Sequence, residues 1–251
     1  LARTTGAEPV VAVIDTGAYV HHPDLVGNLW TNPLEIPGNG IDDDGNGYVD
    51  DVNGYDFSTN SAAMFDSGSH GTHIAGTIAA TGRNGKGIIG LQYRSKVLPL
   101  KVSTDGTWFE GSSIVEACNY VVELRQRGVN IVAVNASYGD RVASVAEENA
   151  IAALRDVGII FCAAAGNNGT DNDSQVFYPA NYNLTNIISV GALNQANTLA
   201  SFSNFGSASV DLAAPGVNVY STYPLTMLGR TSSVTVGSAS YLCSNITYSG
   251  L

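Results

Sequence analysis

The sequence predicts an α/β protein with a doubly wound, mostly parallel sheet and helices on both of its faces. Short, continuously apolar runs recur along the chain, as expected for strands that are buried on both sides. Segments with helical spacing of apolar residues separate these runs, and parallel strands need such crossovers. The composition, with 44% hydrophobic and 13% charged residues in a chain of 251, suits one compact domain.

Five strands and three helices follow from this pattern. The expected strands cover five apolar runs: residues 10–14, 97–102, 131–135, 159–165 and 187–191. The expected helices comprise one of small residues that opens at His70, one whose face carries Ile114, Cys118, Val121, Val122 and Arg125, and one whose face carries Val142, Val145, Ala146, Asn149, Ala153 and Leu154.

The character of the chain changes near residue 226. From there it is rich in Ser, Thr, Gly and Tyr, with short alternating stretches at 233–236 and 239–242 that predict β-hairpins. We therefore expect a main domain at residues 1–225 and the start of an inserted β-rich segment at residues 226–251.

Charge and cysteine content exclude several function classes. With 11 Lys and Arg against 22 Asp and Glu, the net charge of −11 would repel a nucleic acid. No stretch reaches the roughly 20 apolar residues that span a bilayer, and a signal peptide is either absent or already removed. The three cysteines lack metal-ligand spacing, and Cys118 and Cys162 are expected to be thiols of the core.

Polar residues gather where the predicted strands end, which is where parallel sheets usually carry their chemistry. Asp15 ends the first strand, and His70 opens the helix of small residues. A carboxylate and an imidazole could act together as the orienting group and the base that turn a hydroxyl into a nucleophile. By itself, an aspartate after a strand is more often a turn or capping residue, and a lone histidine is usually structural.

Further motifs give this pair a context. Together with Ala164-Ala165-Gly166-Asn167 and Leu212-Ala213-Ala214-Pro215-Gly216, Asp15 and His70 resemble the subtilisin-like serine peptidase family over roughly residues 10–222. The resemblance implies a secreted endopeptidase that acts on polypeptides and is made with a propeptide. It also implies that Asp15 is the acid of a catalytic triad, His70 its general base and Asn167 an oxyanion donor.

The same resemblance implies the substrate-binding residues. Ser137, Tyr138 and Gly139 correspond to a segment whose backbone pairs with the substrate as an added strand, so that main-chain hydrogen bonds would supply affinity. Ala164, Ala165 and Gly166 correspond to the opposite wall of the pocket for the residue before the scissile bond. Small side chains in that wall would leave room for a substrate side chain.

The family's nucleophile motif, Gly-Thr-Ser-Met-Ala, does not occur in the chain. No serine after Thr222 has that context, so we expect the serine to come from the remaining part of the parent protein, beyond Leu251. It could follow an inserted domain, or it could lie on a second chain of a processed enzyme. The chain alone is expected to cleave nothing.

Two other functions compete with a peptidase. A pseudopeptidase or calcium-dependent protein-binding module would keep the cleft without the nucleophile, although such a module has no evident need for Asp15, His70 and Asn167 together. Another kind of α/β hydrolase would require Gly-x-Ser-x-Gly between a strand and a helix, which Gly237-Ser238-Ala239 does not fulfil.

An acidic loop at residues 39–51 predicts a calcium site. Acids and amides alternate there around glycines, and Ca²⁺ prefers several oxygen ligands at once. The candidate ligands are the side chains of Asp42, Asp44, Asn46 and Asp50 and the carbonyl group of Tyr48. The alternative is a solvated acidic turn, in which so many unpaired carboxylates would repel one another. The family resemblance suggests a further calcium ligand, Asp24, paired with residues 81–89.

Overall fold

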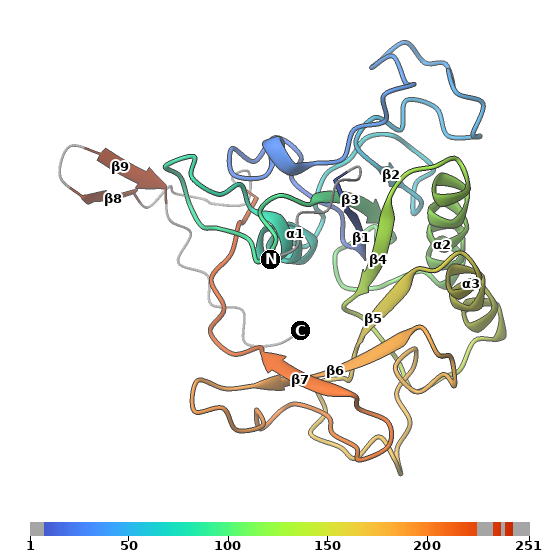
Figure 1. Cartoon of the computed structure of the whole chain (residues 1–251), viewed down its shortest axis with the longest axis vertical. Coiled ribbons are helices and arrows are strands. Elements are labelled where there is room, and N and C mark those ends of the chain that lie inside the picture. The colour runs from blue at the N-terminus through green and yellow to red at the C-terminus, as the bar shows by residue number, and fades with distance from the viewer. Residues whose placement is uncertain (1–7, 225–232, 237–238, 243–251) are drawn as a thin grey trace.

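The computed structural model describes residues 8–224, 233–236 and 239–242, and it confirms the predicted fold class. Seven strands form one parallel sheet in the order β2-β3-β1-β4-β5-β6-β7 (Figure 1). These strands are β1 (Val10–Asp15), β2 (Tyr55–Asp56), β3 (Lys96–Lys101), β4 (Ile131–Ala136), β5 (Ile160–Ala164), β6 (Ile187–Leu193) and β7 (Leu212–Pro215).

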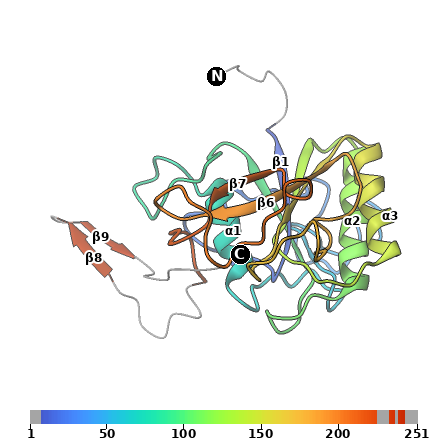
Figure 2. The ribbon, with the colours of Figure 1, turned by 90° about the horizontal axis from the view of Figure 1, so that it is seen from below.

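Helices cover both faces of this sheet. α2 (Gly111–Gln126) and α3 (Val145–Asp156) lie side by side on one face, and α1 (His70–Ala79) lies on the other (Figure 1, Figure 2). β1 contributes to both cores because successive side chains of a strand point to opposite faces. Ala12 and Ile14 belong to the larger core that includes α2 and α3, whereas Val13 packs with residues of α1.

The strand order determines where a site can form. From β1 the chain passes through α1 to β3 on one side, and then through α2 to β4 on the other side of β1. This reversal makes the carboxyl end of β1 the topological switch point, where doubly wound sheets bind their ligands.

Two strands and one helix boundary differ from the prediction. β2 has only two residues, too few for a periodic signal, and β7 is a largely exposed edge strand. α3 begins later than expected, because the side chain of Ser144 caps it by accepting a hydrogen bond from the Glu147 N–H at 3.3 Å. Val142, expected on the helix face, therefore lies in the preceding loop and is 74% exposed. The predicted face is also wrong in the first turns of α3, where Val145, Ala146 and Asn149 are exposed and the buried residues are Ala150, Ile151 and Leu154.

Three further predictions concern the hairpin after residue 226, the cysteines and the lack of a membrane-spanning segment. β8 (Ser233–Val236) and β9 (Ala239–Leu242) pair antiparallel in a separate sheet, as the hairpin prediction requires. Cys118 is fully buried, Cys162 is half-buried, and Cys243 lies outside the described residues. Among the helices of the described ranges, none combines the length and apolar character needed to cross a membrane.

A buried ion pair joins β2 to β3 at the edge of the sheet. The Nζ atom of Lys101 lies 2.8 Å from Oδ2 of Asp56, and the two side chains are 0% and 1% exposed. The ammonium also lies 3.4 Å from the centre of the Phe65 ring, a cation–π contact. Because Lys101 pairs in register with Asp15, this ion pair lies beside the end of β1.

Replacing Asp56 with Asn should leave the Lys101 ammonium buried without a counter-charge and lower the free energy of unfolding by about 3–5 kcal/mol. Urea denaturation measures this change. Asp156→Asn is a matched control, because Asp156 forms an ion pair of the same length, 2.8 Å, with Arg155 at the surface. A loss in the Asp56 variant no larger than that in the control would contradict a structural role for the buried pair.

Candidate active site

The centre of the candidate site is a buried contact between Asp15 and His70. Asp15 is the last residue of β1 and is fully buried, and His70 is the first residue of α1. The Nδ1 atom of His70 lies 2.8 Å from each carboxylate oxygen of Asp15. The backbone N–H of Thr16 donates to Asp15 Oδ1 at 2.7 Å. The fold thus brings together two residues that are 55 positions apart in the sequence.

Asp66 ties the turn after β1 to the first turn of α1. Its Oδ1 accepts a hydrogen bond from Thr16 Oγ1 at 2.7 Å, and its Oδ2 accepts from the N–H of Thr72 at 2.8 Å. The two segments approach so closely that a Cβ on Gly71 would lie 2.0 Å from the carbonyl oxygen of Gly17. Asp66 was not among the residues predicted from the sequence, where its only signal is its place in the polar run before the helix.

Burial and charge act in opposite directions on the pKa of His70. Burial lowers the pKa, whereas the negative charge and hydrogen bond of Asp15, with a smaller effect from Asp66, raise it, and the net result lies above the ordinary 6.5. The folded chain therefore favours the protonated imidazole. Protonation of His70 contributes fully to stability below pH 6.5, and this contribution is lost as the pH rises through the folded-state pKa.

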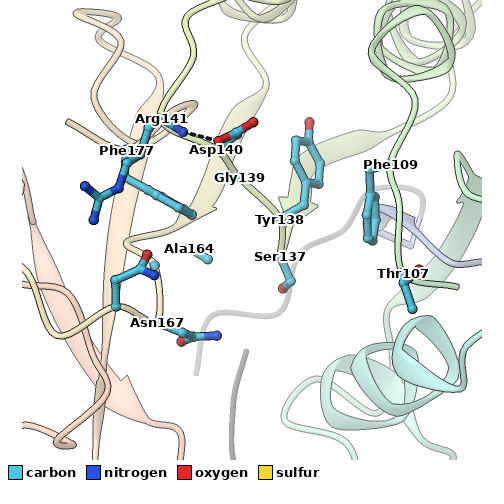
Figure 3. Close-up of a pocket in the computed structure, with 12 residues that line it drawn as sticks. Thr107, Phe109, Ser137, Tyr138, Gly139, Asp140, Arg141, Ala164, Asn167 and Phe177 are labelled. Carbon is cyan, nitrogen blue, oxygen red and sulfur yellow. Dashed lines mark hydrogen bonds between the residues drawn. The ribbon is translucent and has the colours of Figure 1, made fainter. Parts of the chain in front are cut away.

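A cleft of about 430 Å³ lies at the carboxyl ends of β4 and β5. Five of the six predicted substrate-binding residues line it, together with the predicted oxyanion donor: Ser137, Tyr138, Gly139, Ala164, Gly166 and Asn167. Figure 3 shows Asn167 and Phe177 on one side of the segment 137–139, with Thr107 and Phe109 on the other. The predicted substrate segment thus runs through the middle of the cleft.

Ala165 is the exception among the predicted wall residues. It is fully buried, and its N–H donates to the carbonyl group of Val190 in β6 at 2.9 Å, so it does not line the cleft. Phe177, by contrast, does line the cleft, and its ring packs against two glycines. A Cβ on Gly139 would lie 2.3 Å from the Phe177 ring, and one on Gly166 would lie 3.1 Å from it. The glycines therefore make the space that the ring occupies.

The acidic loop brings two predicted metal-binding residues together with a third that the sequence analysis missed. Carboxylate oxygens of Glu35, Asp42 and Asp44 all lie within 4.8 Å of one another. Glu35 is buried, and its carboxylate accepts hydrogen bonds from the N–H groups of Asp43 and Asp50 at 2.9 and 3.0 Å. Glu35 precedes the acidic run and belongs to no motif, so its place in the cluster could not be predicted.

Asn46 and Asp50 lie outside this three-carboxylate cluster. The Oδ1 atom of Asn46 accepts a hydrogen bond from the N–H of Tyr48 at 2.8 Å, and its Nδ2 donates to the fully buried Asp51 at 2.9 Å. The carboxylate of Asp50 accepts hydrogen bonds from the backbone N–H groups of residues 38–40. Asp51 also accepts a hydrogen bond from the hydroxyl of Tyr120 at 2.5 Å, which fixes the loop to α2.

Asp24 contacts the loop with which the family resemblance pairs it. It is 1% exposed, its Oδ1 accepts a hydrogen bond from Asn84 Nδ2 at 2.7 Å, and its Oδ2 accepts one from the N–H of Ile88 at 2.8 Å. Both carboxylate oxygens of Asp24 therefore accept hydrogen bonds from the loop at residues 81–89.

The chain is similar to known proteins over most of its length. The family model described as the subtilase family matches residues 6–248. The thermophilic serine proteinase of Bacillus sp. (strain AK1) is 35% identical over 212 residues, 84% of this chain and 45% of that protein. Subtilisin of Bacillus pumilus is 35% identical over 221 residues, 88% of this chain and 69% of that protein. The chain thus spans about half to two thirds of the length of these relatives.

A solved structure resembles the fold as well. The crystal structure of a cold adapted subtilisin-like serine proteinase matches with a TM-score of 0.65 and 26% identity, over 86% of this chain and 66% of the other.

NMR titration of the His70 imidazole in this chain should give a pKa above 6.5. In Asp15→Asn the charge is lost while the burial remains, so the pKa should fall below 6.5. Asp156→Asn, which changes a surface carboxylate, should leave the titration of His70 unchanged. An Asp15 variant in which His70 titrates as in the unaltered chain would show that Asp15 does not set this pKa.

Proposed function

Because the chain belongs to the subtilase family, we propose that the protein of which it forms part is a serine endopeptidase that cleaves extended polypeptides. The observation that carries this proposal is the 2.8 Å contact of His70 Nδ1 with both carboxylate oxygens of the buried Asp15. A carboxylate in this position fixes the tautomer of the imidazole and stabilises its charged form. A hydroxyl needs such a base to become a nucleophile.

In the proposed reaction, Nε2 of His70 takes the proton of a serine hydroxyl while the serine oxygen bonds to the carbonyl carbon of the scissile peptide. Asp15 stabilises the imidazolium that forms. The imidazolium then gives the proton to the leaving amine as the C–N bond breaks. In the second half, His70 takes a proton from a water molecule as the water oxygen bonds to the acyl carbon. The bond between that carbon and the serine oxygen then breaks, His70 returns the proton to the serine oxygen, and the carboxylic acid product leaves.

The cleft residues have separate roles in this proposal. The side-chain amide of Asn167 donates a hydrogen bond to the oxyanion of the tetrahedral intermediate, an interaction that strengthens as negative charge develops. The backbone of residues 137–139 pairs with the substrate as an added strand. Ala164, Gly166 and Phe177 then bound the pocket for a substrate side chain.

We place the attacking serine outside this chain, because no serine here has the family's nucleophile context. In this proposal residues 1–225 form the peptidase domain, and residues 226–251 begin an inserted segment. Secretion and a propeptide belong to the same proposal and rest on the family resemblance. The alternative is a pseudopeptidase or a calcium-dependent binding module, against which the paired Asp15 and His70 argue.

A structural calcium ion held by Glu35, Asp42 and Asp44 is the second part of the proposal. Three carboxylates within 4.8 Å of one another repel unless a cation or protons neutralise them. Carboxylate oxygens are the ligands that Ca²⁺ prefers, and the carbonyl group of Tyr48 could add another. The proposal does not extend to Asp24, which belongs to no such group of three metal-binding side chains among the described residues.

The whole parent protein should hydrolyse a fluorogenic peptide, and a serine-directed phosphonate should abolish this activity, whereas the 251-residue chain alone should cleave nothing. Only neutral His70 can accept a proton, so the rate should fall as the pH drops through the raised pKa of His70 and level off above it. His73→Gln should keep this acid limb, since His73 instead contacts the carbonyl group of Val219 at 3.2 Å. A rate that stays flat from about pH 5 to 9 would contradict the base role.

Calcium should raise the melting temperature of this chain, and EDTA should reverse the shift. An ion that binds only the folded state stabilises that state by about 2.7 kcal/mol when its concentration is about a hundred times its Kd. Asp42→Asn, Asp44→Asn and Glu35→Gln should each reduce the shift. Asp43→Asn is a matched control from the same acidic run, since Asp43 lies outside the three-carboxylate cluster and its carboxylate accepts hydrogen bonds from Ile36 and Asn39. A melting temperature that does not respond to calcium would remove this part of the proposal.

A further inference from the structure

We infer that Asn204, together with Asn172, is a positioning residue that holds the backbone on both sides of Asn167 and so sets the position of the Asn167 amide. The inference rests on the proposed role of Asn167 as an oxyanion donor. Neither Asn204 nor Asn172 lines the cleft, and both are buried, with exposed fractions of 1% and 0%.

Asn204 makes hydrogen bonds to the chain before and after Asn167. Its backbone N–H donates to the carbonyl group of Gly166 at 2.8 Å. Its side-chain Oδ1 accepts from the N–H of Asn168 at 2.8 Å and from the N–H of Thr170 at 3.3 Å. One buried side chain therefore satisfies two backbone donors of the turn that follows β5.

Asn172 completes the clamp. Its Nδ2 donates to the carbonyl group of Ala165 at 2.8 Å, and its Oδ1 accepts from Nδ2 of Asn204 at 3.0 Å. The two asparagines thus bind one another, and between them they bind the backbone of residues 165, 166, 168 and 170.

Gly166 and Asn204 also fit one another sterically. Gly166 has φ of +110°, and a Cβ at this position would lie 2.4 Å from Nδ2 of Asn204. The amide of Asn204 therefore occupies the space that a side chain at position 166 would take. This contact permits the sharp turn that directs the chain from β5 into the cleft lining at Asn167.

The clamp is anchored to the sheet. The Oγ atom of Ser203 accepts a hydrogen bond from the N–H of Ala192 in β6 at 2.8 Å, and it donates to the carbonyl group of Asn204 at 2.9 Å. An oxyanion donor has to lie about 2.7–3.1 Å from the place where charge develops. Because the turn is anchored to β6, the backbone of Asn167 is held in one position, and its side-chain amide can then lie at this distance.

The test is a double-mutant cycle in the whole parent protein, with kcat and KM measured on a peptide substrate. Asn167→Ala should lower kcat by about 10²–10³-fold, a range taken from subtilisin, a member of the same family. Asn204→Ala should lower kcat by up to about 10²-fold with little change in KM, as expected when a reacting group is misplaced. In the Asn167→Ala background the same change should have little further effect, because the donor to be positioned is already gone.

Asn186→Ala is the matched control for loss of an asparagine that binds backbone groups away from the cleft. Asn186 is half-buried, and its Nδ2 donates to the carbonyl groups of Ile151 in α3 and of Ile159, which precedes β5. It should lower stability without changing kcat in either background.

The outcomes distinguish the inference from the function on which it rests. An equal loss of kcat from Asn204→Ala in both backgrounds would overturn the positioning role, since a general structural defect does not depend on Asn167. A parent protein that cleaves nothing would overturn the proposed function, and the inference with it. An active parent in which Asn167→Ala leaves kcat unchanged would overturn only the assigned donor and its clamp.

Amide hydrogen exchange in the 251-residue chain gives a readout without catalysis. The N–H groups of Asn168 and Thr170 should exchange slowly in the unaltered chain and lose protection in Asn204→Ala, but keep it in Asn186→Ala. If Asn204→Ala does not fold, Asn204→Asp, which keeps the acceptor oxygen, should fold and retain the protection of Asn168. Slow exchange of both groups in a folded Asn204→Ala chain would overturn the clamp.

Discussion

The contact between Asp15 and His70 depends on the close approach of α1 to the end of β1, and much of the surrounding structure serves that approach. Gly71 can lie against the carbonyl group of Gly17 only because it has no side chain. The hydroxyl of Thr16 accepts a hydrogen bond from the Gly71 N–H at 3.0 Å and donates to the buried Asp66. The charge and the hydrogen bond of Asp15, with a smaller contribution from Asp66, together outweigh the cost of burying a protonated imidazole.

Buried polar side chains also hold other loops of the molecule in place. The loops that follow the strands expose backbone N–H and carbonyl groups that must find partners when they are buried. Asp66 accepts a hydrogen bond from a backbone N–H group at the start of α1, and Asn204 accepts one from the turn after β5. Asp51 plays a similar part in the acidic loop, where it accepts a hydrogen bond from the side chain of Asn46. Each is a buried polar side chain that joins a loop to a helix or to another loop. The loops are thereby held by the protein's own side chains, which suits a site that must keep a fixed geometry.

The acidic loop is organised around two kinds of carboxylate. Those of Asp50 and Asp43 accept hydrogen bonds from nearby backbone groups and shape the loop. Those of Glu35, Asp42 and Asp44 also accept hydrogen bonds from backbone N–H groups, but in addition they converge, and their negative charges are the reason to propose a cation between them. Because Tyr120 of α2 holds Asp51, an ion in the loop would also stabilise the packing of the loop on the core.

The sequence alone determined the fold class, since apolar runs and helical periodicity are local patterns. Short contiguous motifs in it also made Asp15, His70 and Asn167 the candidate catalytic residues. Five of the six substrate-binding residues predicted from the sequence line the cleft. Glu35, Asp66 and Asn204 could not be predicted, because their partners are backbone groups and carboxylates that only the folded chain brings near. The burial of Ala165, between two residues that line the cleft, was likewise decided by its hydrogen bond to β6. Local spacing specifies elements and motifs, whereas the direction of each side chain depends on how those elements pack.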